Sequence, residues 1–183
     1  MKPVSRTHRL ARLAAVSSCC AAVLAASAWP SAATPARHAT QSCSAAATRV
    51  WLGLGLGGGT AGTYYYPLEF SNIGKRACTL YGYPGVSAYR GALKQVGPAA
   101  ARNPHAHGTV MLAPGATVHA TIGIHDWGAL CTRSVPADGL RVYPPGQRTA
   151  QTIPFSFGAC PHRSVLSVSP VTAGVGIPGY TTP

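Results

Sequence analysis

The stretch RACTLYGYPGVSAY, residues 76–89, decides how this chain folds. Its segments CTLYGY and GVSAY have the length and composition of short β-strands, and Pro84 and Gly85 between them are residues that turn a chain. Gly82 relieves the pleat of the first strand, and Cys78 can anchor that strand to another cysteine. Because strand and turn chemistry accounts for each position without a ligand, we interpret the stretch as a structural corner.

Strand-like segments separated by Gly and Pro turns continue on both sides of this corner. TYYYPLEFS, residues 63–71, alternates between two faces, and Pro67 within it suggests an edge strand or a bulge. Hairpin patterns surround the turns at Pro114 and Pro145. Since no amphipathic helical run interrupts this series, the pattern predicts an antiparallel β-sandwich or barrel.

The N-terminus has the features of a secretory signal peptide over residues 1–28. Basic residues without an acid precede an apolar run, and ASA at 26–28 fits the small-x-small cleavage pattern. A rival pattern is the lipobox VSSC, in which Cys19 would carry a lipid, but cleavage there would leave half of the apolar region on the mature chain. No later apolar run has the length of a transmembrane segment. We therefore expect a secreted, extracytoplasmic protein, with a lipid-anchored form as the alternative.

Four cysteines follow the signal peptide: Cys43, Cys78, Cys131 and Cys160. An even number in an exported chain favours disulfides, and four cysteines allow three connectivities. The midpoint of the first two is 60.5, within GGGTAG, and the midpoint of the last two is 145.5, within PPGQ. Residues equidistant from a hairpin turn lie opposite each other on antiparallel strands, close enough for a disulfide. The spacing thus predicts Cys43–Cys78 and Cys131–Cys160.

The order of these motifs carries a family resemblance. Cys43 is followed by YPLEFSNIG, CTLYGYPGVS, a turn at Gly91, VMLAPG, Cys131, LRVYPPG, and Cys160 ahead of LSVSP. This order resembles the secreted bacterial family called domain of unknown function 4232, over about residues 43–171. The resemblance implies an extracytoplasmic β-sandwich without an established activity, so it transfers no catalytic residues. Family members often have an acid just before the Gly91 turn, where this chain has Tyr89 and Arg90, which argues against a cation site there.

Together these observations predict an all-β protein, an antiparallel immunoglobulin-like β-sandwich with two disulfides. The expected organisation is a signal peptide at 1–28, a disordered lead-in at 29–42, the sandwich domain at 43–172 and a flexible tail at 173–183.

Basic residues far outnumber acidic ones. From residue 29 onward the chain has eleven Lys and Arg residues against the three acids Glu69, Asp126 and Asp138, a net charge of +8. Such a surface attracts polyanions, which outside a bacterial cell are wall polymers, lipid headgroups and stray nucleic acid. The alternative is that the charge serves only solubility. We expect anionic cell-wall polymers or an envelope protein as the partner, and no specific nucleic acid.

Candidate binding residues fall into two groups. The basic pairs closest in sequence would form a basic rim if their turns lie at one end of the sandwich; they are Lys75 with Arg76, and Arg90 with Lys94. The aromatic alternative to the structural corner is a tyrosine-lined binding rim formed by Tyr81, Tyr83 and Tyr89.

No catalytic residue and no cofactor are predicted. Hydrolysis by paired carboxylates needs two acids within about 5–9.5 Å of each other, and the chain is poor in acids. A triad could be drawn from His125, a serine, and Asp126 or Asp138, but the sequence has no nucleophile elbow. The cysteines are expected to be paired and so are not nucleophiles. We therefore expect a non-enzymatic binding or structural module.

Two further function classes stay open. His105 and His107 would share one face of a strand, and His119 would lie near them across the following turn, a set that suits copper or zinc. We nevertheless predict no bound metal, because only Asp126 is placed to orient such ligands. The other class is a secreted protease inhibitor that presents the loop ARNPHAHG, residues 101–108.

Overall fold

The computed structural model describes residues 40–54 and 57–179. The expected signal peptide, the lipobox residue Cys19 and most of the expected lead-in fall outside these residues. Within the described ranges the chain forms strands, turns and short 3-10 segments, and no helix there is long and apolar enough to cross a membrane. The prediction of an all-β fold is confirmed.

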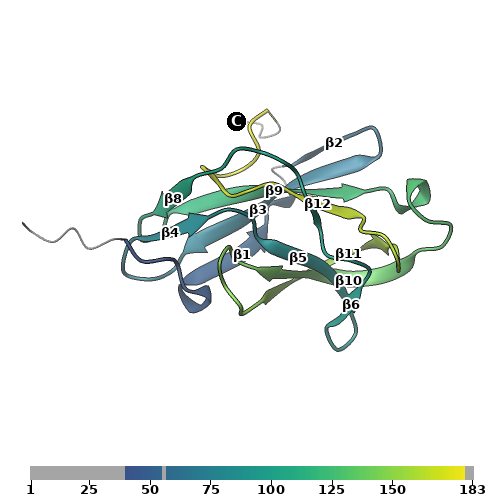
Figure 1. The fold of residues 1–183 in the computed structure, drawn as a ribbon, viewed down its shortest axis with the longest axis horizontal. Helices are drawn as coiled ribbons and strands as arrows, with labels where there is room; N and C mark the ends of the chain where they lie inside the picture. The colour runs from purple at the N-terminus through teal and green to yellow at the C-terminus, as the bar shows by residue number, and fades with distance from the viewer. Residues whose placement is uncertain (1–39, 55–56, 180–183) are drawn as a thin grey trace, which may run out of the picture. The chain divides into compact units, whose positions relative to one another are not determined.

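The chain forms two main sheets and a two-stranded ribbon (Figure 1). The larger sheet contains β1 (Thr48–Leu52), β2 (Gly58–Thr60), β3 (Thr63–Asn72), β7 (Ala101–Arg102), β9 (Thr117–His125), β12 (Leu166–Val168) and β13 (Thr172–Ala173). Its order is β1-β3-β9-β12-β7, with β2 beside β3 and β13 beside β9. The long strands β3 and β9 therefore form its centre.

The smaller sheet has the order β11-β10-β5-β6. Its strands are β5 (Gly85–Arg90), β6 (Lys94–Val96), β10 (Val135–Tyr143) and β11 (Gln151–Ala159), and the ribbon pairs β4 (Cys78–Tyr81) with β8 (Thr109–Leu112). Short 3-10 turns precede β1 and β10: η1 (Ala45–Ala47) and η3 (Trp127–Ala129). The ladders between these strands are antiparallel, as predicted, except for the short β12–β7 pair, which is parallel.

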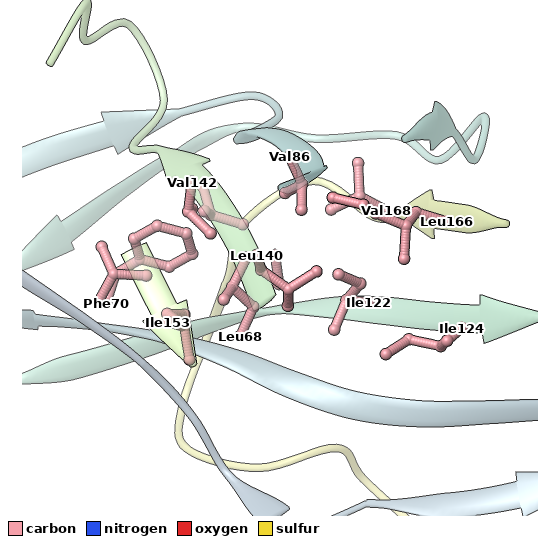
Figure 2. Packing of buried hydrophobic residues seen from close by; sticks show 14 of the residues in the cluster. Leu68, Phe70, Val86, Ile122, Ile124, Leu140, Val142, Ile153, Leu166 and Val168 are labelled. Atoms are coloured by element: carbon pink, nitrogen blue, oxygen red, sulfur yellow. The ribbon is translucent and has the colours of Figure 1, made fainter. Parts of the chain in front are cut away.

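The two main sheets share one hydrophobic core. Leu68 and Phe70 of β3 and Ile122 of β9 come from the larger sheet, and Leu140 and Val142 of β10 come from the smaller one; all five are fully buried. Figure 2 shows these side chains gathered between the strands. Each contributes about 1.5–3 kcal/mol through burial. The arrangement is a β-sandwich, compatible with the predicted immunoglobulin-like type.

The sequence suggested that Pro67 marks an edge strand or a bulge, and the edge-strand alternative is wrong because β3 lies between β9 and the strands β1 and β2. The β1 ladder ends at the Leu52–Leu68 pair, and the β2 ladder begins at the Gly58–Tyr65 pair. Pro67 falls in the gap between these two ladders, where its missing N–H removes no β1 or β2 hydrogen bond. The proline is thus accommodated by a local break in the neighbouring strands.

The predicted hairpins have different outcomes. The turn around Pro145 joins β10 to β11, which pair antiparallel from Val135 with Ala159 to Val142 with Gln151, so this hairpin is confirmed. The turn at Pro114 also exists, but β8 pairs with β4 whereas β9 pairs with β3. The second prediction was wrong because the two adjacent strands separate into different sheets.

Both predicted disulfides are present. Cys131 and Cys160 have Cα atoms 6.0 Å apart and lie just outside the β10–β11 hairpin, as the midpoint rule requires. Cys43 and Cys78 have Cα atoms 4.8 Å apart and lie just outside the antiparallel β1–β3 ladder, whose pairs are centred on residue 60, as the midpoint argument predicts. The residues leading to Cys43 also run parallel to β4, with hydrogen bonds from the Cys43 N–H to the Thr79 carbonyl and from the Thr79 N–H to the Gln41 carbonyl.

The ordered domain extends beyond both predicted boundaries. Before Cys43, Ser42 forms a bridge with Thr79. After residue 172, the segment expected to be a flexible tail begins within β13, which pairs with β9, and continues to the buried residue Ile177. The C-terminal segment, residues 172–177, is therefore a covering element of the larger sheet.

Candidate functional site

The three tyrosines of the opening stretch occupy different environments. Tyr89 is buried in the core. Tyr83 is half-buried, and its hydroxyl donates to the Asn103 carbonyl (2.6 Å) and accepts from the His105 N–H (3.2 Å). Tyr81 is 61% exposed. The structure therefore does not assemble the expected tyrosine rim, and two of its three members have structural roles.

Tyr81 and Tyr83 instead contact a residue of the loop before β8. The His107 ring centroid lies 5.1 Å from that of Tyr81 and 5.2 Å from that of Tyr83, and the Arg102 guanidinium lies 5.4 Å from the Tyr83 centroid. Gly82, between the tyrosines, has a φ of +83°, a conformation that a side chain would strain. These contacts hold the 101–108 loop, the expected inhibitor loop, against the corner.

The three candidate metal ligands do not converge. His105 and His107 are exposed in the loop, where the His107 Nδ1 lies 3.1 Å from the His105 carbonyl oxygen. His119 is buried in β9, and its Nδ1 lies 2.9 Å from the Gly174 carbonyl oxygen. In the part of the chain that the structure describes, no group of three or more His, Cys, Asp or Glu side chains could hold a metal ion. The predicted route between His107 and His119 is also missing, because β8 and β9 are not paired.

Glu69 is the most unusual titratable residue in the described chain. It lies in β3 opposite His119 and is 0% exposed beneath the C-terminal segment. Its Oε1 accepts a hydrogen bond from the Gly176 N–H (2.7 Å), while its Oε2 is buried without a partner. Burial raises the pKa of this carboxyl, and the Gly176 hydrogen bond and the neighbouring His119 offset part of that rise. The contacts describe a structural carboxyl rather than a catalytic one.

The other two acids are also bound to backbone N–H groups. Asp126 caps η3 by accepting from the Gly128 N–H (3.0 Å), and Asp138 accepts from the Gly91 N–H (2.7 Å). Asp138 thus supplies, from β10, a carboxylate at the turn where the local sequence has Tyr89 and Arg90. None of the three acids forms an ion pair with a Lys or Arg among residues 40–54 and 57–179. The cations of the domain are therefore not neutralised by its own carboxylates.

The predicted basic pairs lie in separate places. Lys75 and Arg76 are in the turn that leads into β4, whereas Arg90 and Lys94 flank the β5–β6 turn. Figure 1 shows β4 and the β5–β6 turn well apart along the long axis of the view. The structure does not unite these four residues in a single rim.

A third basic group was not predicted from the sequence. Arg133, His162 and Arg163 line a hollow of about 500 Å³ beside the Cys131–Cys160 disulfide; we call it the basic hollow. Each of the three residues lies within three positions of one of these cysteines. The predicted Cys131–Cys160 disulfide could therefore have indicated this basic group, because it brings the two segments that carry these residues together.

His125 does lie beside a serine, but not in the triad that the sequence allowed and that we did not predict. The His125 Nε2 lies 3.0 Å from the Ser167 Oγ, and its Nδ1 lies 2.8 Å from the Thr63 Oγ1. Ser167 is buried, and Asp126 and Asp138 both accept hydrogen bonds from backbone N–H groups rather than from His125. The geometry gives the imidazole a structural role between two strands.

A disulfide-braced β-sandwich with an un-neutralised basic surface is the class of protein that these features define. The family model for the domain of unknown function (DUF4232) matches residues 43–172, and the chain belongs to this family. No curated protein and no solved structure matches the chain.

Proposed function

We propose that this protein is a secreted, extracytoplasmic, non-enzymatic module that binds anionic polymers of the cell envelope. The observation that carries the proposal is that its carboxylates are bound to backbone N–H groups and not to its Lys and Arg side chains. Glu69, Asp126 and Asp138 each accept a backbone N–H hydrogen bond, and the described chain forms no ion pair with them. The positive potential therefore extends to the surface and attracts polyanions.

The remaining features agree with an extracytoplasmic binding role. Two disulfides brace the sandwich, and disulfides persist chiefly in oxidising compartments. The exposed basic residues lie mostly at turns, where side chains reach solvent and a polymer can contact several of them in succession. An envelope protein with an acidic surface would be attracted by the same positive charge. Comparing binding to anionic wall polymers with binding to such a protein distinguishes the two candidate partners.

Co-sedimentation with isolated cell wall tests the proposal. We expect binding at low salt that falls steeply as ionic strength rises, because the screening length shortens from about 30 Å at 0.01 M to about 8 Å at 0.15 M. Wall from which the anionic polymers have been extracted is the matched control and should bind much less. Lack of binding at low salt, or binding that high salt leaves unchanged, would show that the charge serves only solubility.

A further inference from the structure

The basic hollow is formed by two short segments that the Cys131–Cys160 disulfide joins. One segment follows η3 and leads into β10; the other follows β11. The Cys131 N–H donates to the Trp127 carbonyl, and the adjacent ladder pair is Val135 with Ala159. The backbone under the hollow is thus held by a disulfide, a 3-10 turn and a strand pair. Its full lining is Leu130, Cys131, Thr132, Arg133, Pro161, His162 and Arg163.

The two arginines of the hollow have unused hydrogen-bonding capacity. Both are exposed, and neither makes an ion pair, a hydrogen bond or an aromatic contact within the described chain. In contrast, the guanidinium groups of Arg102 and Arg141 lie over tyrosine rings. A guanidinium presents five N–H donors in a fork that matches an oxyanion. The hollow therefore offers two such forks and an imidazole to a ligand.

The lining contains no acid. The carboxylate nearest in sequence, Asp126, is bound to the Gly128 N–H and lines a neighbouring hollow instead. The two guanidinium groups that line one hollow without a counter-ion repel one another, so an anion that enters is attracted by both of them. A volume of about 500 Å³ accommodates a phosphate group together with the polymer unit that carries it.

We propose that the basic hollow is a binding site for a phosphate group of an anionic polymer, with Arg133, His162 and Arg163 as ligands. The inference rests on the proposed function that polyanions are the partners, and it adds where the contact lies and which anion it recognises. Phosphate suits the site better than carboxylate because its tetrahedral geometry lets guanidinium forks from two different segments approach it from different sides. A carboxylate is satisfied by a single arginine fork.

The experiment is titration calorimetry of the purified mature protein with a polyphosphate of defined length at low salt. We expect Arg133→Ala and Arg163→Ala each to weaken binding about tenfold, the loss typical of a charge-assisted hydrogen bond. The charge-matched controls are Arg49→Ala and Arg148→Ala, which remove the same charge from exposed positions outside the hollow. Each control should weaken binding by no more than about threefold, because an isolated surface charge contributes little.

Two further comparisons define the anion and the role of the disulfide. Poly-glutamate with the same number of charges should bind more weakly than polyphosphate; equal or tighter binding would overturn the assignment to phosphate. Cys131→Ser combined with Cys160→Ser keeps every charge but releases the two segments, and we expect it to lower affinity as the arginine variants do. The arginine variants decide the question if the double serine variant does not fold.

The results test the proposed phosphate site and the proposed polyanion-binding function separately. If wild type binds polyphosphate and all four arginine variants weaken it equally, the contact is diffuse: the site is refuted and the proposed function stands. If wild type binds neither polyphosphate nor cell wall, both are refuted. Selective loss in the two hollow variants, with wall binding reduced in parallel, supports both.

Discussion

Replacing Glu69 with glutamine should stabilise the domain at neutral pH. Glu69 is fully buried, and its Oε2 has no partner, so ionisation places a charge where one oxygen is unsatisfied. Leaving a buried acceptor unpaired costs about 1–3 kcal/mol. Glutamine keeps an oxygen for the Gly176 N–H and carries no charge, but its amide N–H groups occupy the unpaired position of Oε2, so the gain comes from removing the buried charge. We therefore expect Glu69→Gln to raise the free energy of unfolding near pH 7 by about 1 kcal/mol, since the unpaired amide offsets part of the gain.

The pH dependence of this gain has a definite sign. Burial holds the pKa of Glu69 above its ordinary value of 4.5, so the folded state retains a proton that the unfolded state has lost. Stability from this group is fully present below pH 4.5 and is lost as pH rises from there through the folded-state pKa. The advantage of Glu69→Gln should therefore be small in acid, grow across that window, and then stay constant.

Urea unfolding of wild type and Glu69→Gln at a series of pH values measures this difference. Asp138→Asn is the control, since Asp138 also accepts a backbone N–H but is exposed; its stability difference should not follow the pH window of Glu69. The reasoning would be refuted if Glu69→Gln destabilised the domain at neutral pH, or if its effect were the same at every pH.

Two other substitutions test the contacts that join the elements. Gln151 of β11 accepts from the Val50 N–H and donates to the Ala45 and Thr48 carbonyls, so Gln151→Ala should lower the free energy of unfolding by about 2–4 kcal/mol. The control Gln95→Ala removes a single exposed hydrogen bond and should cost less than about 1 kcal/mol. Equal losses for the two variants in urea unfolding would contradict this role of Gln151. Tyr83→Phe removes the hydroxyl that holds the 101–108 loop and should cost about 1 kcal/mol, whereas Tyr81→Phe should leave stability unchanged. A larger loss for Tyr81→Phe in thermal unfolding would reverse the roles of the two tyrosines.

Local pattern predicted the parts of the fold that depend on neighbours in sequence. The Cys131–Cys160 disulfide followed from its distance to the turn at Pro145, because that turn does form a hairpin. The Cys43–Cys78 disulfide followed in the same way, because the two cysteines flank the antiparallel β1–β3 ladder, whose pairs are centred on residue 60. The predicted hairpin at Pro114 was wrong because the turn between two strands does not determine which sheet each strand joins.

In the candidate sites, too, features set by neighbours in sequence were predictable and features set by distant segments were not. Alternation along β3 separates Leu68, which lies in the core, from Glu69 on the other face, but it could not reveal that the C-terminal segment covers Glu69, since Gly176 lies 107 positions away. Likewise Arg133 and Arg163 are far apart in sequence, and the β10–β11 pairing together with the Cys131–Cys160 disulfide brings them to one hollow. Burial and convergence of this kind depend on tertiary contacts.

The position of β12 sets an order for assembly during synthesis. β12 comes from the last part of the domain, yet it lies inside the larger sheet, between β9 and β7. A chain synthesised from its N-terminus presents β3 and β9 first, and they can pair at once. The edge strand β7 has no sheet partner until residues 166–168 emerge, so the larger sheet of a partly synthesised chain ends at β9 with an open edge.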